Sequence, residues 1–182
     1  ADAIRMACVD TEGQLIDYVL ERRDAEHTAN HIYKGVIRNV LPGMQACFVD
    51  IGTGHNAYLN LGKGKQPEAL GKPHVGQSVM VQVVKEEMLG KGARVTADVS
   101  LAGRFTVLMP MSKSINISKK ITDPAERDRL MKLGQPYLDQ GCGSIIRTAA
   151  AKAEDEDIAA DLQYLWQTWE HISKRYKMAK PS

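Results

Sequence analysis

Short runs of apolar residues alternating with polar ones cover the first 110 residues, and glycines separate many of them. Two runs, 3–9 and 14–21, flank Asp10-Thr11-Glu12-Gly13, a composition that favours a hairpin turn between two strands. Five further runs rich in Val and Ile follow at 32–41, 45–51, 57–61, 78–86 and 93–99. Five short strands with glycine-rich turns predict a small closed barrel, and the OB fold is the commonest such barrel.

After residue 99 the pattern changes to strands that alternate with helices. Residues 105–110 and 143–148 read as strands, and Asp123-Pro124 supplies an N-cap and a first-turn proline for a helix between them. This order predicts a separate α+β unit after the barrel. The fold class is therefore α+β, with three expected parts: an N-terminal hairpin over 1–27, the barrel over 28–99 and the α+β unit over 100–182.

The last segment carries the clearest helical pattern. Its apolar residues fall on one helical face: Ile158, Leu162, Leu165, Trp166, Trp169 and Ile172. Glu154 to Asp157 occupy its first turn, where carboxylates suit the helix dipole. Asp155, Asp157 and Asp161 could suggest a metal site, but carboxylates at the start of an amphipathic helix more often serve the dipole and solubility. We therefore expect no metal here.

The charge distribution says more than the net charge of +2. Residues 28–122 carry 12 basic and 5 acidic side chains, an excess of seven positive charges, whereas the flanking segments are negative. A segment of this kind suits a polyanion, although a solvated basic face with no partner remains open.

Aromatic and basic residues interleave within the first barrel runs. Tyr33, Lys34, Arg38, Phe48, His55 and Tyr58 lie there. OB folds bind single-stranded nucleic acid by stacking bases on exposed rings while basic side chains follow the phosphates. The alternative is that Phe48 and Tyr58 belong to the barrel core.

Two absences in the sequence narrow the class of protein. Cys8, Cys47 and Cys142 are odd in number and widely spaced, so we expect three buried free thiols rather than a disulfide framework or a zinc site. No apolar run approaches the length of a membrane span, and we expect a cytoplasmic protein.

Several motifs, in order along the chain, resemble the ribonuclease E/G family. They are the segment from Asn30 to Gly52, Val83-Val-Lys-Glu, Gly90-Lys-Gly-Ala-Arg-Val-Thr96, Ser100 to Pro110, Ile117-Ser-Lys-Lys, Ile145-Ile-Arg-Thr-Ala149, and Asp161-Leu with the two tryptophans that follow. The segment from Asn30 is similar to the S-one-type OB domain of that family. Together these motifs cover nearly the whole chain.

The resemblance implies a role for each part. The hairpin would contribute to an RNase H-like subdomain that this chain leaves incomplete, and the barrel would grip single-stranded RNA. The α+β unit would be the family's 5′ sensor, which prefers RNA ends with a single phosphate.

The resemblance also assigns candidate residues to these roles. RNA-binding residues would be Phe48, Tyr58, Lys91, Lys34, Lys119 and Lys120, and 5′-phosphate ligands would be Arg147 and Thr148, with backbone contacts from Gly103 and Val107. Tyr58 stands where the family has phenylalanine, and Lys119 and Lys120 stand where arginines are expected. The two lysines should act as point charges with less directional specificity.

The full-length family enzyme is a magnesium-dependent endoribonuclease of RNA processing and decay, with a zinc link and a homo-oligomeric assembly. Its paired catalytic aspartates and its Cys-x-x-Cys motif have no counterpart in this sequence. We therefore expect no catalytic residues and no cofactor in this chain. Two alternatives remain: a self-contained, non-catalytic RNA-binding protein, and an OB-type protein-interaction module.

Overall fold

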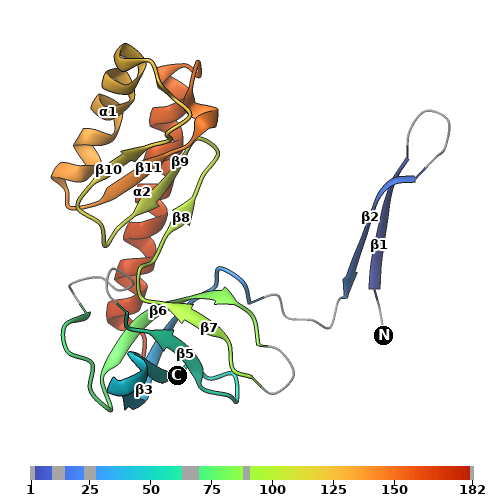
Figure 1. The fold of residues 1–182 in the computed structure, drawn as a ribbon, viewed down its shortest axis with the longest axis vertical. Helices are drawn as coiled ribbons and strands as arrows, with labels where there is room; N and C mark the ends of the chain where they lie inside the picture. The colour runs from blue at the N-terminus through green and yellow to red at the C-terminus, as the bar shows by residue number, and fades with distance from the viewer. Residues whose placement is uncertain (1–2, 10–14, 23–27, 63–69, 88–90, 181–182) are drawn as a thin grey trace.

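The computed structural model describes residues 3–9, 15–22, 28–62, 70–87 and 91–180. Its N-terminal strands, β1 (Ala3–Val9) and β2 (Leu15–Arg22), pair antiparallel as the predicted hairpin. The hairpin stands apart from the other elements in Figure 1. The turn predicted at residues 10–13 lies outside the described residues. Membership of the hairpin in an RNase H-like subdomain stays a prediction.

Five strands close into the barrel that the sequence predicts. They are β3 (Ile32–Leu41), β4 (Ala46–Asp50), β5 (Ala57–Asn60), β6 (Ser78–Lys85) and β7 (Arg94–Thr96), joined in the order β3-β4-β5-β7-β6. A short 3-10 turn, Pro42–Met44, connects β3 to β4. Alternate residues of these strands point inward, so Ile37, Val49, Leu59 and Val81 are fully buried in the barrel core.

A second sheet follows the barrel. It consists of β8 (Leu101–Ala102), β9 (Thr106–Met109), β10 (Ile115–Ile117) and β11 (Gly143–Ile146), in the order β10-β11-β9-β8. β11 pairs parallel with β10 and antiparallel with β9. The sequence predicted β9 and β11 but missed β8 and β10, because strands of two and three residues are too short to show an alternation.

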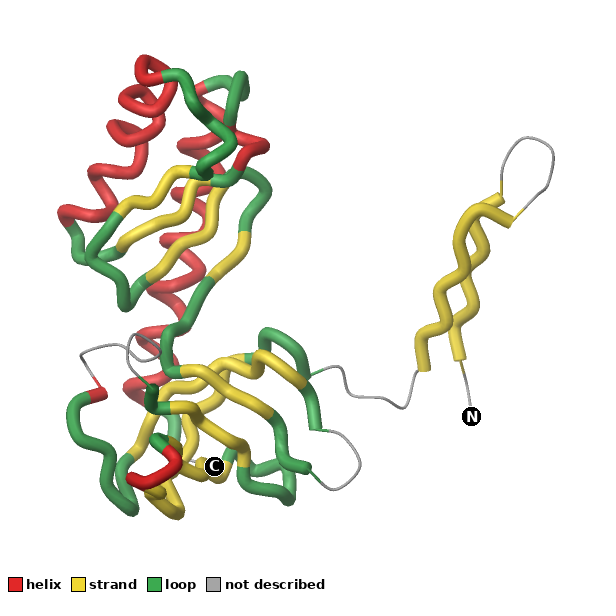
Figure 2. Tube along the Cα trace, viewed as in Figure 1, coloured by secondary structure: helices red, strands yellow, loops and turns green. Residues whose placement is uncertain are grey.

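Two helices pack on this sheet: α1 (Pro124–Asp139) and α2 (Asp155–Met178). Figure 2 shows both on one side of it. The Asp123 side chain caps α1 at Ala125 N, as predicted, and Ile158, Leu162 and Leu165 of α2 are buried. Trp166 and Trp169 pack at the edge of the core. The α+β unit is therefore confirmed.

α2 runs beyond the sheet to the barrel (Figure 1). There Lys34 of β3 donates hydrogen bonds from Nζ to the carbonyl oxygens of Tyr176 (2.9 Å) and Ala179 (2.6 Å). The last carbonyls of a helix lack intrahelical partners and carry partial negative charge, so a lysine suits this position. Lys34 also lies 4.8 Å from the centre of the Tyr176 ring.

Cys47 and Cys142 are buried free thiols, as expected, and burial raises the pKa of each to about 11. Cys8 lies in β1, whose side chains are outside the description. None of the described helices combines the length and the apolar character needed to cross a membrane.

Candidate nucleic-acid interface

Two aromatic side chains stand side by side on the outer face of the barrel. Phe48 on β4 is the cross-strand partner of Tyr58 on β5, and their ring centres lie 6.1 Å apart at 70°. Both are half-buried, whereas their strand neighbours Cys47 and Leu59 are fully buried inside. Strand alternation therefore places the two rings outside the core, where they present an aromatic surface.

Arg94 extends this aromatic pair across the next strand. It is the cross-strand partner of Tyr58, and its guanidinium carbon lies 5.9 Å from the centre of the Tyr58 ring. Lys85 of β6 pairs with Arg94 in turn. The row Phe48, Tyr58, Arg94 and Lys85, called the barrel row below, thus places two rings and two cations on consecutive strands. Sequence analysis missed Arg94 because the register between β5 and β7 is invisible in the sequence.

Other basic residues of the barrel differ in their surroundings. Lys91 is exposed, and it precedes Gly92, where a side chain would collide with the carbonyl oxygen of Asn56. Arg38 is exposed but binds Asp50 at 2.8 Å, and this hydrogen bond holds the pKa of Asp50 below its usual range. Lys34 is held by the end of α2, and its predicted role in RNA binding stays a prediction.

A second group of candidates meets at one edge of the α+β sheet. β10 and β11 run parallel and end there, with Ile117 paired to Ile146, and β9 begins there at Thr106, the partner of Ile146. The residues just beyond these strand ends are therefore neighbours. They are Gly103 to Phe105 before β9, Ser118 to Lys120 after β10, and Arg147 with Thr148 after β11. We call this group the sheet edge.

Arg147 is exposed and held in place by main-chain contacts. Its Nη1 donates to the carbonyl oxygen of Gly103 at 2.9 Å, and its backbone N–H donates to the carbonyl oxygen of Phe105 at 2.8 Å. Within the described part of the chain, no carboxylate pairs with Arg147 and no acceptor binds its Nε or Nη2. Among these residues no carboxylate offsets the charge of the guanidinium, and its Nε and Nη2 are free to donate to an anion.

Two hydroxyl groups adjoin Arg147. Thr148 Oγ1 and Ser118 Oγ lie 2.8 Å apart, and the backbone N–H of Lys120 donates to Ser118 Oγ at 3.3 Å. Arg127 of α1 holds the Ser118 turn through Nη1, which donates to the carbonyl oxygens of Ser118 and Ile121. Lys119 and Lys120 are exposed on this turn.

The structure thus brings Arg147, Thr148, Lys119, Lys120 and Gly103 to one edge. Val107 lies slightly further along β9, where it is half-buried and pairs with Ile145 and Ala102. Ser118 was missed as a site residue, because nothing in the sequence shows that its hydroxyl meets Thr148.

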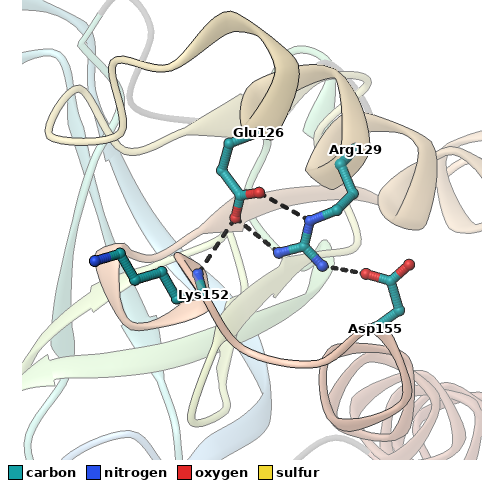
Figure 3. Close-up of polar contacts among 4 residues, drawn as sticks. All are labelled: Glu126, Arg129, Lys152 and Asp155. Carbon is teal, nitrogen blue, oxygen red and sulfur yellow. Dashed lines mark hydrogen bonds and ion pairs between the residues drawn. The ribbon is translucent and has the colours of Figure 1, made fainter.

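A network between the two helices fixes the segment that follows Arg147 (Figure 3). Glu126 and Arg129 of α1 form an ion pair at 2.7 Å, Arg129 also binds Asp155 at the start of α2, and Glu126 accepts from the backbone N–H of Lys152 at 3.4 Å. The hydrogen bond from Arg129 holds the pKa of Glu126 below its usual range. Both ends of segment 147–155 are therefore anchored.

The acidic residues of α2 do not assemble into a metal site. Asp155 binds Arg129, and the carboxylate of Asp161 accepts four hydrogen bonds from the turn between β8 and β9. Among the described residues, no three His, Cys, Asp or Glu side chains come together as a metal-binding group. These residues do not fit the magnesium or zinc that the resemblance implies for the full-length enzyme.

An OB-type barrel with an outward aromatic row, followed by an α+β unit with a cationic edge, defines a class of candidate RNA-binding proteins. Comparison with known proteins narrows the class. Residues 100–182 match the model of the Ribonuclease E/G family. Ribonuclease G of Salmonella typhimurium is 37% identical over 95% of this chain and 38% of its own length. Ribonuclease E of Nostoc is 36% identical over 96% of this chain and 26% of its own length.

Over nearly its whole length the chain is similar to members of the ribonuclease E/G family. It spans 38% of the length of the Ribonuclease G relatives from Salmonella and from Escherichia coli.

Proposed function

We propose that this chain binds single-stranded RNA at the barrel row and the 5′-terminal monophosphate of that RNA at the sheet edge. The proposal rests mainly on the surroundings of the Arg147 guanidinium. Its guanidinium is exposed, fixed by the carbonyl oxygen of Gly103 and without a carboxylate partner among the described residues. A guanidinium held in this way can donate two parallel hydrogen bonds to a phosphate.

The neighbours of Arg147 suit the same ligand. The hydroxyls of Thr148 and Ser118 already share one hydrogen bond, and either can donate to a phosphate oxygen. Lys119 and Lys120 add positive charge to the edge, as compact charges rather than directional forks. By family resemblance, the backbone of Gly103 and Val107 contributes contacts around the terminal nucleotide.

The barrel row suits the length of a single-stranded RNA rather than its 5′ end. Phe48 and Tyr58 offer the flat apolar surfaces on which bases stack, with little preference for base identity. Arg94 and Lys85 follow on the next strands, and the exposed Lys91 precedes Arg94 by three residues, so all three can supply positive charge for the phosphates.

We further propose that the chain serves an endoribonuclease of RNA processing and decay in the cytoplasm. The family and the names of the relatives support this. The magnesium, the zinc link and the homo-oligomeric assembly implied by the resemblance would then be features of the whole enzyme.

The test uses two short single-stranded RNAs of the same sequence, one with a 5′-monophosphate and one with a 5′-hydroxyl. We expect the purified chain to bind both, to prefer the monophosphate, and to lose affinity as salt is raised, because phosphate contacts release counterions. Equal affinity for the two ends would contradict the sheet-edge assignment. Affinity that does not change with salt would contradict the electrostatic part of the proposal.

A further inference from the structure

Asp161 of α2 receives an unusual number of hydrogen bonds from a turn more than fifty residues away. Its Oδ1 accepts from the backbone N–H of Arg104 at 2.9 Å. Its Oδ2 accepts from the N–H groups of Phe105 (3.1 Å) and Thr106 (2.9 Å) and from Thr106 Oγ1 (2.7 Å). One carboxylate therefore binds three consecutive backbone N–H groups of the β8–β9 turn.

Gly103, at the start of that turn, lies against the same carboxylate. A β-carbon at this position would collide with both carboxylate oxygens, so an alanine here would force the turn and the Asp161 carboxylate apart. The backbone N–H of Gly103 donates to the carbonyl oxygen of Thr106 at 2.8 Å and closes the turn. Its own carbonyl oxygen accepts from Nη1 of Arg147. The contacts thus run from Asp161 through the turn to Arg147.

We propose that Asp161 is a positioning residue of the 5′-phosphate site: its carboxylate fixes the Gly103 to Thr106 turn, and this turn holds the Arg147 guanidinium toward the ligand. The proposal rests on the function proposed above. All four partners of Asp161 are donors, so the position requires a group that only accepts. Hydrogen bonds to a charged acceptor are among the stronger ones in proteins, which suits a support for a binding residue.

This role differs from the two that the sequence suggested for Asp161. Four protein donors surround the carboxylate, one on Oδ1 and three on Oδ2, and among the described residues it does not join two other His, Cys, Asp or Glu side chains in a metal-binding group. Three of the four donors belong to the backbone of a distant turn. Asp161 therefore has a more specific role than that of a favourable charge near a helix N-terminus. No ion pair joins Asp161 to Arg147 in the described part of the chain, so the influence passes through the turn.

Three variants test the proposal. Asp161→Ala removes all four acceptor contacts, and Gly103→Ala retains the carboxylate but forces it and the turn apart. Asp161→Asn keeps one oxygen for three donors but places an NH₂ group opposite the N–H of Arg104. We expect the ratio of affinities for 5′-monophosphate and 5′-hydroxyl RNA to fall about tenfold in the two alanine variants. This fall corresponds to about 1.4 kcal/mol of binding free energy. Asp161→Asn should give an intermediate ratio.

A merely structural role would lower stability without changing that ratio. Leu165→Val is the matched control, because it reduces a buried side chain one turn further along α2. It should lower the unfolding temperature and leave the ratio unchanged. Affinity for 5′-hydroxyl RNA should change less than twofold in every folded variant. An unchanged ratio in folded Asp161→Ala and Gly103→Ala would overturn the proposal.

NMR signals of the Arg147 guanidinium give a readout that does not depend on RNA. We expect a resolved Nη signal in the unsubstituted protein and its loss by exchange in Asp161→Ala and Gly103→Ala. If the unsubstituted protein shows no 5′-end preference, the proposed function fails, and the ligand-binding part of this proposal fails with it. If the Arg147 signal does not respond to Asp161→Ala, the positioning role alone is overturned.

Discussion

The barrel row and the sheet edge differ in how their side chains are held. On the barrel, Phe48, Tyr58 and Arg94 are cross-strand neighbours, and ring contacts alone join them to one another. At the sheet edge, Arg147 is fixed by Gly103, whose turn is fixed by Asp161, and Thr148 by Ser118. A flat surface without directional bonds suits bases of any identity, whereas a rigid, directional set of donors suits one phosphate.

The largest expected effect is on the barrel row. The double variant Phe48→Ala, Tyr58→Ala should weaken binding of 5′-monophosphate and 5′-hydroxyl RNA alike, by about 1–3 kcal/mol for each base that loses its stacking partner. Titration of both RNAs measures this. Tyr164→Ala is the matched control, because this tyrosine is 69% exposed on α2, and it should bind both RNAs normally. A loss confined to one RNA would mean that the two surfaces are not separate.

A smaller effect is expected at Arg94. Arg94→Ala should reduce the slope of log affinity against log salt by about one and weaken binding of both RNAs. Arg94→Lys should restore the slope but not the full affinity, because an ammonium lacks the planar face that stacks beside Tyr58. Arg38→Ala is the comparison, since Asp50 already pairs with that guanidinium. Equal slope changes for Arg94→Ala and Arg38→Ala would contradict the proposal that RNA binds at the barrel row.

At the sheet edge, Ser118→Ala should weaken only 5′-monophosphate RNA, by about 0.5–1.5 kcal/mol, the usual net value of one hydrogen bond. The substitution removes the hydroxyl that orients Thr148. Ser112→Ala is the control. It breaks the hydroxyl pair between Ser112 and Ser114, 3.2 Å apart, which precedes β10, whereas Ser118 follows it. If both serine variants behave alike, Ser118 is not part of the phosphate site.

The smallest effect concerns stability and pH. The folded-state pKa of Glu126 lies below its ordinary value, so its ion pair stabilises the fold fully above that value and is lost as the pH falls through the lowered pKa. Glu126→Gln should therefore lower the urea midpoint at neutral pH, and the difference should vanish in acid. The control, Asp128→Asn, affects a pair at the exposed surface of α1. If the difference in urea midpoint between the unsubstituted protein and Glu126→Gln grew in acid, the pKa of Glu126 would not be lowered in the folded state.

The two surfaces were not equally visible in the sequence. Strand alternation predicted the barrel, and the aromatic residues Phe48 and Tyr58 lie on neighbouring strands only ten positions apart. The sheet edge joins segments around residues 103, 118, 147 and 161, and no periodicity connects such distant positions. Only family resemblance singled out Arg147 and Thr148, and it gave no sign of the contacts made by Ser118 and Asp161.

Two contacts that the sequence analysis did not find share this cause. Lys34 was predicted to bind RNA, which stays a prediction, and its hydrogen bonds to the end of a helix more than 140 residues away were not foreseen. Asp161 looked like one of several acidic residues in the first turns of α2. Its four partners belong to a turn that only the fold brings next to it.

The central claim is that the barrel row binds single-stranded RNA along its length and the sheet edge binds the 5′ end of that RNA. The most direct test is the affinity of Arg147→Ala and Phe48→Ala for RNAs that differ only at the 5′ terminus. The account predicts that Arg147→Ala abolishes the preference for a 5′-monophosphate and leaves 5′-hydroxyl RNA nearly unaffected. Phe48→Ala should weaken both RNAs by the same factor and keep the preference. An Arg147→Ala variant that stays folded and loses affinity for both ends equally would contradict the account.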